Sequence, residues 1–197
     1  MKEIIFASGN KGKVREVKKI FSGTEYEIKS LHELGEVPNI VEDGETFFAN
    51  ALIKAKFIYN IYKQPVIADD SGLAVEQLNG APGVHSARYA GVDATDGDNN
   101  AKLLKELKSY KKPHAAKFVC CAVYYNGNEP ISALGEIHGR IIYEPRGEKG
   151  FGYDPLFIPN GYEITTGEME LEDKNKISHR GKAFNKLKEL LTQGGNK

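Results

Sequence analysis

Two long stretches of alternating apolar and polar residues, separated by a tight-turn sequence, constrain the fold of this chain most. The stretches span 115–125 and 131–143, and Asn126-Gly127-Asn128 lies between them. Because Asn-Gly favours the backbone of a hairpin turn, the two stretches are predicted to be antiparallel neighbours. A sheet that contains such a hairpin is not purely parallel.

The rest of the chain alternates between helical and strand patterns, with no internal repeat and no linker-like composition. We therefore expect an α/β fold with a mixed sheet, organised as one domain over residues 1–197 with a frayed tail at 192–197. The expected elements are a strand at 3–7, a helix from Val14, a long helix capped by Thr46 or Asp43, a strand at 66–68, a helix at 98–109, and a last helix at 179–191 with Ser178 as N-cap.

Charge and composition exclude several classes of protein. The 27 Lys and Arg residues balance 27 Asp and Glu residues, so no net positive field is available to bind nucleic acid. No apolar run reaches the length of about 18 residues that a membrane span needs, so we expect a cytoplasmic protein without membrane contact. Cys120 and Cys121 are adjacent on a predicted strand, where their side chains point apart, and we interpret both as buried apolar residues.

The first candidate site lies between the first strand and the first helix, in Ser8-Gly9-Asn10-Lys11-Gly12-Lys13. Backbone N–H groups at a helix start attract anions, and the two lysines supply charges that suit phosphates. The spacing is not that of a Walker A motif. A plain Gly-Asn turn with solvent-facing lysines explains the same residues equally well.

The second candidate site is a pair of acids, Asp69 and Asp70, at the end of the apolar strand 66–68. Since neighbouring strand residues face opposite ways, one carboxylate is expected to point at the site and the other elsewhere. Ordinary turn chemistry also uses Asp-Ser-Gly, but burying two acids costs free energy unless cations or donors compensate. Glu42 lies before the long helix and could join one of these acids in binding Mg²⁺. Acids at a helix start also interact favourably with the helix dipole, which explains Glu42 without a metal.

Three further features are candidates for contacts with a ligand. Lys54 lies on the otherwise apolar side of the long helix, where it needs a partner or must reach solvent. Gly150-Phe151-Gly152-Tyr153-Asp154 places aromatics in a loop that could stack a flat base while Asp154 accepts from a ring N–H, although plain core anchoring competes. Lys174 precedes the last helix, and His179 and Arg180 put basic charge at its first turn, where it opposes the helix dipole; an anionic or carbonyl-bearing ligand would explain them.

Together these motifs resemble the inosine triphosphate pyrophosphatase family, over residues 4 to about 187. The matching segments are Ser-Gly-Asn-Lys-Gly-Lys at 8–13, Glu-Asp-Gly-Glu-Thr-Phe at 42–47 followed by Asn-Ala at 50–51, Ala-Asp-Asp-Ser-Gly-Leu at 68–73, Gly-Ala-Pro-Gly-Val-His-Ser-Ala-Arg-Tyr-Ala-Gly at 80–91, Gly-Phe-Gly-Tyr-Asp-Pro at 150–155 and Ile-Ser-His-Arg-Gly-Lys-Ala at 177–183. The resemblance implies an elongated mixed α/β fold with two lobes around a central nucleotide cleft, usually a homodimer. It further implies Mg²⁺-dependent hydrolysis of ITP, dITP and XTP to the monophosphate and pyrophosphate.

Carried over by position, the resemblance also implies roles for individual residues. Glu42 and Asp70 would bind the metal, and Asp70 would activate the attacking water. The substrate-binding residues implied are Ser8, Gly9, Asn10, Lys11, Gly12 and Lys13 around the triphosphate, Lys54 and Ser71 nearby, and Phe151, Gly152, Tyr153, Asp154, Lys174, His179 and Arg180 around the base.

The sequence departs from the family pattern at His85 and at Thr166-Gly167, which places the local packing and the dimer contact in question. Neither departure is expected to touch a residue assigned to chemistry. Two other functions stay open from the residues. An aspartyl-phosphate phosphatase would use Asp69 or Asp70 as nucleophile, although it expects Asp-x-Asp near the first strand. A nucleotide sensor would bind without cleaving, although a base, a metal-binding acid and several cations together argue against it.

Overall fold

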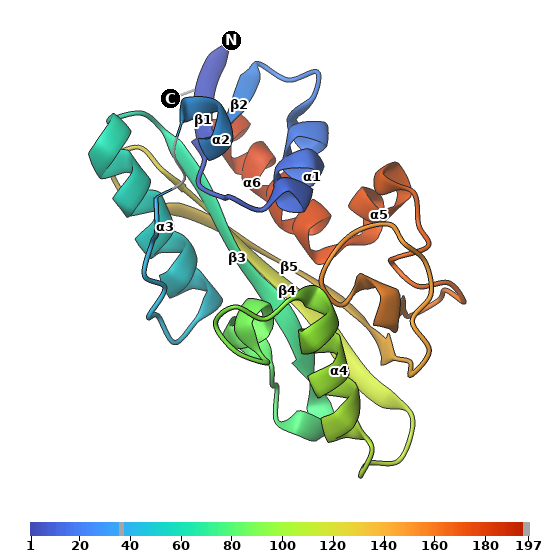
Figure 1. Ribbon diagram of the computed structural model, residues 1–197. Helices are drawn as coiled ribbons and strands as arrows, with labels where there is room; N and C mark the ends of the chain where they lie inside the picture. Colours follow the sequence, from blue (N-terminus) through green and yellow to red (C-terminus); the bar gives the residue numbers. More distant parts are fainter. Residues whose placement is uncertain (36–37, 195–197) are drawn as a thin grey trace. The chain divides into compact units, whose positions relative to one another are not determined.

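The computed structural model describes residues 1–35 and 38–194, and its six strands form one mixed sheet (Figure 1). The strand order is β2-β1-β3-β4-β5-β6. β1 is parallel to both β2 and β3, whereas β5 and β6 are antiparallel. The strands are β1 Lys2–Phe6, β2 Tyr26–Ser30, β3 Val66–Val75, β4 His114–Tyr125, β5 Ile131–Ile141 and β6 Phe157–Pro159.

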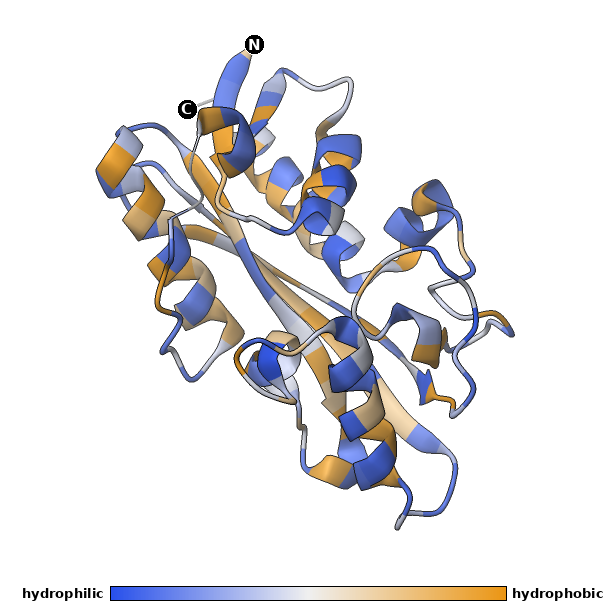
Figure 2. Ribbon diagram, viewed as in Figure 1, coloured by the Kyte–Doolittle hydropathy of each residue, from blue (hydrophilic) through white to orange (hydrophobic). Residues whose placement is uncertain are grey.

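Helices alternate with these strands along the chain and flank the sheet (Figure 1). The α-helices are α1 Lys11–Phe21, α2 Leu31–Leu34, α3 Phe47–Tyr62, α4 Asp96–Leu107, α5 Leu171–Ile177 and α6 His179–Gly194, and the 3-10 turns are η1 Glu76–Leu78, η2 Gly83–Arg88 and η3 Asp154–Leu156. The ribbons of the helices carry both hydrophilic and hydrophobic colours along their length (Figure 2). Within the described residues, none of the helices combines the length and the apolar character that a membrane crossing requires.

The chain divides into two compact units, each built from separate stretches of sequence. The first unit contains 1–70, 120–135 and 180–197, and it buries two apolar clusters. In one cluster, Phe6 and Ile67 pack with α1 and α6, and the rings of Phe6 and Phe184 meet edge to face at 5.7 Å. In the other, the alternate strand residues, such as Ile5 and Ala68, pack with α3.

The second unit contains 71–119 and 136–179 and has one apolar cluster. Leu103 and Leu107 of α4 are fully buried in it with Phe157. Gly72 of β3 lies against η2 so closely that a Cβ atom would overlap the carbonyl oxygen of Gly83 and the hydroxyl of Ser86.

The predicted mixed α/β architecture is confirmed, and so are the two strands on either side of the Asn126-Gly127-Asn128 turn. Thr46 is the N-cap of α3, since its Oγ1 accepts from the N–H of Ala49 at 3.1 Å. The expectation that Asp69 and Asp70 end a strand is wrong, because β3 continues through Ser71-Gly72 to Val75. α6 continues to Gly194, and the last part of the predicted frayed tail, 195–197, lies outside the described residues.

Candidate active site

Strand β3 presents Asp69 and Asp70 to its two opposite faces, as the alternation of strand side chains requires. Asp69 lies on the side of Cys120, whose thiol donates to Asp69 Oδ2 at 3.7 Å. Asp70 lies on the side of α3 and contacts Asn50. Both carboxylates are buried, so each needs compensation from its own surroundings.

Asp70 is compensated by two side chains of α3. Asn50 Nδ2 donates to Asp70 Oδ2 at 3.1 Å, and the Lys54 ammonium lies 3.6 Å from Oδ1. Burial raises the pKa of Asp70 above its ordinary value, although Lys54 and Lys13 oppose that shift. A carboxylate with a raised pKa in a site with few exposed groups is suited to accept a proton.

Lys54 also pairs with Glu42, so one cation lies between the two acids predicted to bind metal. Its Nζ is 2.7 Å from Glu42 Oε2, and only 10% of its side chain is exposed. Burial alone would lower the pKa of Lys54, but the carboxylates of Asp70, Asp69 and Glu42 outweigh it and raise that pKa. Lys54 therefore does not reach for solvent, and Glu42 and Asp70 are close enough to share a positive charge.

Asn50 is a site residue that the sequence reasoning did not assign. It precedes Lys54 by one helical turn, and its Oδ1 accepts from the N–H of Gly44 at 2.8 Å. Asn50 thus connects Asp70 to the loop that carries Glu42. A buried asparagine one turn before a buried lysine, on an apolar helix face, was the signal that could have revealed it.

Asp69 is held in a separate network of buried charges. Lys13 Nζ lies 3.1 Å from Asp69 Oδ2, and Arg180 Nε donates to the same oxygen at 3.2 Å. The other side of Arg180 pairs with Glu16 at 2.6 Å. Burial alone would raise the pKa of Asp69, but Lys13 and Arg180 outweigh it and hold that pKa well below its ordinary value. Asp69 is therefore a permanent anion that fixes two cations.

Arg180 belongs to this buried network, whereas the family resemblance implies that it contacts the base. Its guanidinium lies between Glu16 and Asp69, and 1% of its side chain is exposed. A base would reach it only after the surrounding side chains moved. Glu16 was not singled out from the sequence, where it reads as one charged residue in the middle of an amphipathic helix.

The Ser8–Lys13 segment leads from β1 into α1 and is shaped by its own polar groups. Asn10 is the N-cap of α1, because its Oδ1 accepts from the N–H of Lys13 at 3.0 Å, and the helix begins earlier than the expected Val14 for this reason. The His32 ring is hydrogen bonded to the carbonyl oxygen of Gly9 at 2.9 Å. Lys11 is exposed, whereas the Lys13 ammonium is turned toward Asp69. The solvent-facing interpretation therefore fails for Lys13.

In the second unit, Asp154 organises the loop that carries Phe151 and Tyr153. Its Oδ2 accepts from the Phe151 N–H at 2.9 Å and from the Lys174 ammonium at 2.7 Å. Its Oδ1 accepts from the Thr166 hydroxyl at 2.9 Å. Asp154 and Lys174 are both almost fully buried. Both carboxylate oxygens of Asp154 thus accept hydrogen bonds from the protein. To accept one from a ring N–H of a base, Asp154 would have to lose one of these donors.

One departure from the family pattern does touch a candidate site residue, contrary to the expectation from sequence. The departing residue is Thr166, and the site residue that it contacts is Asp154.

Lys174 Nζ lies 5.2 Å from the centre of the Phe151 ring, which fixes a cation beside the aromatic face. His179 is buried and stacks on Phe118 with ring centroids 4.7 Å apart and an interplanar angle of 11°. Ser71 is half-buried in β3, directly after Asp70, and His85 is exposed in η2.

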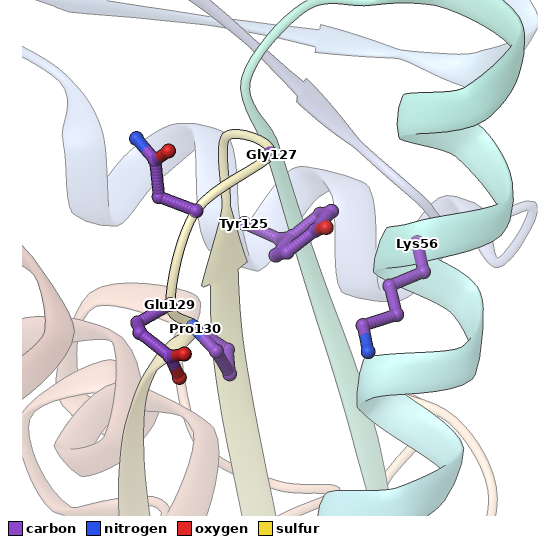
Figure 3. A pocket seen from close by; sticks show the side chains of 6 residues that line it. Lys56, Tyr125, Gly127, Glu129 and Pro130 are labelled. Atoms are coloured by element: carbon purple, nitrogen blue, oxygen red, sulfur yellow. The ribbon is translucent and has the colours of Figure 1, made fainter.

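A hollow of about 500 Å³ lies elsewhere in the first unit, and none of the predicted site residues lines it. It is lined by Lys56 of α3, Tyr125 at the end of β4, and the hairpin residues Gly127, Asn128, Glu129 and Pro130 (Figure 3). Its acid and its lysine lack the burial of the Asp70 and Asp69 networks. The candidate chemistry therefore lies with the two carboxylate networks of β3.

Comparison with known proteins agrees with this class of fold, a mixed sheet flanked by helices. The sequence matches the Ham1 family over residues 4–190, and the chain belongs to that family. The resemblance identified from the motifs is thereby confirmed.

Several relatives match along nearly their whole length. The dITP/XTP pyrophosphatase of Bacillus licheniformis is 48% identical over 195 residues, covering 98% of this chain and 100% of the relative. The dITP/XTP pyrophosphatase of Bacillus subtilis is 47% identical over 193 residues, covering 97% and 98%. Among solved structures, a HAM1 protein from Coxiella burnetii has a TM-score of 0.88 at 40% identity, with coverage of 98% and 100%, and the Staphylococcus aureus Ham1 protein has a TM-score of 0.85 at 39% identity, with full coverage of both chains.

We predict that Arg180→Met lowers the free energy of unfolding by about 3–5 kcal/mol, because it leaves the buried Glu16 and Asp69 carboxylates without their shared cation. Urea unfolding at pH 7 measures this loss. The matched control is Arg140→Met, since Arg140 pairs with Glu163 at 3.4 Å on the surface. The control should lose less than about 1 kcal/mol.

The loss should also depend on pH. The folded-state pKa of Asp69 is depressed, so its stabilising contribution is complete above the ordinary value of 3.8 and is lost as pH falls below it. The difference between the unsubstituted protein and Arg180→Met should therefore be constant near neutrality and shrink below about pH 4. Equal losses for the Arg180 and Arg140 variants would contradict the buried network.

Proposed function

We propose that this chain hydrolyses non-standard purine nucleoside triphosphates, ITP, dITP and XTP, to the monophosphate and pyrophosphate. The observation that carries the proposal is the Lys54 ammonium between Glu42 and Asp70, with Lys13 held beside the neighbouring Asp69. The names of its relatives in Bacillus licheniformis and Bacillus subtilis, dITP/XTP pyrophosphatase, support the same substrate class.

We propose Mg²⁺ as the cofactor, held by Glu42 and Asp70. Both carboxylates already lie within 4 Å of one ammonium, which supports their fit to a shared cation. Among the described residues, no group of three or more acids, histidines or cysteines could hold a metal ion. Two carboxylates suffice for Mg²⁺, which fills its remaining positions with water and phosphate oxygens and supplies charge neutralisation and water activation.

The protein's own residues would then divide the work of hydrolysis between the α and β phosphates. Asp70, with its raised pKa, orients the attacking water and takes its proton. Asn50 fixes the Asp70 carboxylate, and Lys13 and Lys54 neutralise the negative charge that develops on the departing pyrophosphate. The Ser8–Lys13 segment brings its backbone N–H groups to the triphosphate at the start of α1.

Selection of the base would rest on Phe151, Lys174 and His179. Phe151 offers an aromatic face to the purine, with the Lys174 cation beside it. A donor in this position favours the 6-oxo edge of hypoxanthine and xanthine, whereas the 6-amino group of adenine leaves two donors facing each other. Each unsatisfied buried donor costs about 1–3 kcal/mol. Arg180 contributes by fixing Asp69 and Lys13, and the family resemblance also assigns it a contact with the base.

We also propose a homodimer, which the resemblance implies, and a cytoplasmic location, which the sequence analysis predicts. Gel filtration with light scattering would check the first. Fluorescence microscopy of a tagged chain would check the second.

A nucleotide panel tests the proposed activity directly. With Mg²⁺ present, ITP, dITP and XTP should release pyrophosphate at least about 100-fold more efficiently than ATP, in line with two unsatisfied donors of about 1.4 kcal/mol each. Pyrophosphate and phosphate are measured separately. Release of phosphate alone would indicate a phosphatase, and release of neither would indicate a nucleotide sensor.

Asp70→Asn should lower turnover of ITP by about 10²–10⁴-fold, the usual contribution of a positioned general base. Calorimetry should still detect ITP binding, because the triphosphate and base contacts remain. Asp43→Asn is the control, since Asp43 is an exposed acid of the loop that carries Glu42. Turnover by Asp70→Asn within tenfold of the unsubstituted protein would remove the proposed base.

Mg²⁺ without nucleotide should stabilise the protein through Glu42. At ten times the dissociation constant, the expected gain is about 1.4 kcal/mol, seen as a rise in Tm. Glu42→Gln should abolish the rise, whereas Glu45→Gln, in the same loop but exposed, should keep it. An undiminished rise in Glu42→Gln would show that the metal is held elsewhere.

A further inference from the structure

Helix α4 holds the backbone of Gly152 from both sides. The Gly152 N–H donates to Asp96 Oδ2 at 2.7 Å, and Asn100 Nδ2 donates to the Gly152 carbonyl oxygen at 3.1 Å. Asp96 and Asn100 are one helical turn apart and therefore lie on one face of α4. Both polar groups of a single loop residue are thus fixed by two side chains 52 or more residues away in sequence.

Gly152 is not fixed in this loop by close packing around its Cα. Its φ is +62°, and a Cβ atom there would meet nothing within 4 Å, so packing does not hold it. Its neighbours are the two aromatics of the loop. The Phe151 N–H donates a hydrogen bond to the Asp154 carboxylate, and the Tyr153 hydroxyl donates to the Ser86 carbonyl oxygen at 2.8 Å. The hydrogen bonds from α4 fix the residue that joins these two anchored neighbours.

Helix α4 is a rigid support for such a clamp. Thr95 and Asp98 form a capping box at its start, and Leu103 is fully buried in the apolar cluster of the second unit. Asn99, between the two clamping residues, bonds instead to the segment after η2, through the Ala90 N–H and the Ala87 carbonyl oxygen. Asn99 and Asn100, adjacent in sequence, therefore hold different segments.

We propose that Asp96 and Asn100 are positioning residues for nucleobase recognition, because they fix Gly152 and through it the ring of Phe151. This inference rests on the proposed function. Neither residue is expected to touch the nucleotide, and neither belongs to the acids and lysines of β3 and its surroundings. Their removal should weaken recognition of the base while leaving recognition of the phosphates intact.

The chain offers variants that separate this role from the stability of α4. Asn100 Oδ1 is buried and has no hydrogen-bond partner among the described residues, so Asn100→Ala removes one bond and one unsatisfied acceptor together, which limits the cost to the fold. Asp96→Asn keeps an oxygen that can accept from Gly152 and serves as the conservative rescue. Asp98→Ala breaks the capping box of the same helix turn without touching Gly152 and is the matched control.

The kinetic test compares ITP with inorganic tripolyphosphate, which has the phosphates but no base. Asp96→Ala and Asn100→Ala should raise KM for ITP by about three- to tenfold, the range expected for one lost hydrogen bond, with kcat within about twofold. Competitive inhibition by tripolyphosphate should be unchanged. Asp96→Asn should restore KM, and Asp98→Ala should leave it unchanged. An unchanged KM in both alanine variants, an equal rise in Asp98→Ala, or an equal loss of tripolyphosphate inhibition would overturn the inference.

A second measurement does not depend on turnover. The chain contains no Trp, so Phe151→Trp introduces a single fluorescent reporter into the loop. Adding Asn100→Ala should increase quenching of this reporter by acrylamide and lower its anisotropy, and adding Asp98→Ala should change neither. Unchanged quenching with Asn100→Ala would overturn the positioning role. If the unsubstituted protein failed to hydrolyse ITP, the proposed function would fall, whereas an active protein with unchanged KM in the variants would remove only this inference.

Discussion

The structure depends on the compensation of two adjacent buried carboxylates in the middle of a strand. Asp69 and Asp70 face opposite sides of β3, so one set of cations cannot serve both. Lys13 and Arg180 compensate Asp69, and Lys54 with Asn50 compensates Asp70. An uncompensated acid in either place would cost several kcal/mol. Helices α1, α3 and α6 therefore meet this strand through charge as well as through apolar packing.

The same arrangement recurs in the second unit, where Lys174 compensates Asp154. In both units a buried acid is fixed by a lysine from a distant helix, through contacts within the protein itself. Such groups lose little further freedom when a nucleotide binds, which is the basis of electrostatic preorganisation. The difference lies in the use of the acid. Asp70 and Glu42 contact the same lysine, Lys54, whereas the two oxygens of Asp154 accept from Phe151, Thr166 and Lys174.

Hairpin chemistry predicted the mixed sheet, and strand alternation predicted that Asp69 and Asp70 face opposite ways, because both are local properties. The family resemblance selected Asp70 as the partner of Glu42, and the contact of both acids with Lys54 was not predicted. The sequence did not predict the roles of Glu16, Asn50 or Thr166. Each of these acts through a partner determined by tertiary packing, and only the one-turn spacing of Asn50 and Lys54 gave a local signal. The continuation of β3 past Asp70 was missed for a similar reason. Ser71-Gly72 has turn composition, but its backbone stays extended where Gly72 packs against η2.

Gly72 also limits how this region can evolve. Every other residue type carries at least a Cβ atom, and at this position that atom would overlap backbone and side-chain oxygens of η2. The observed packing therefore accommodates only glycine at position 72. A single substitution of Gly72 would therefore be selected against during evolution. Another residue fits at this position only if the Gly83–Arg88 turn also moves.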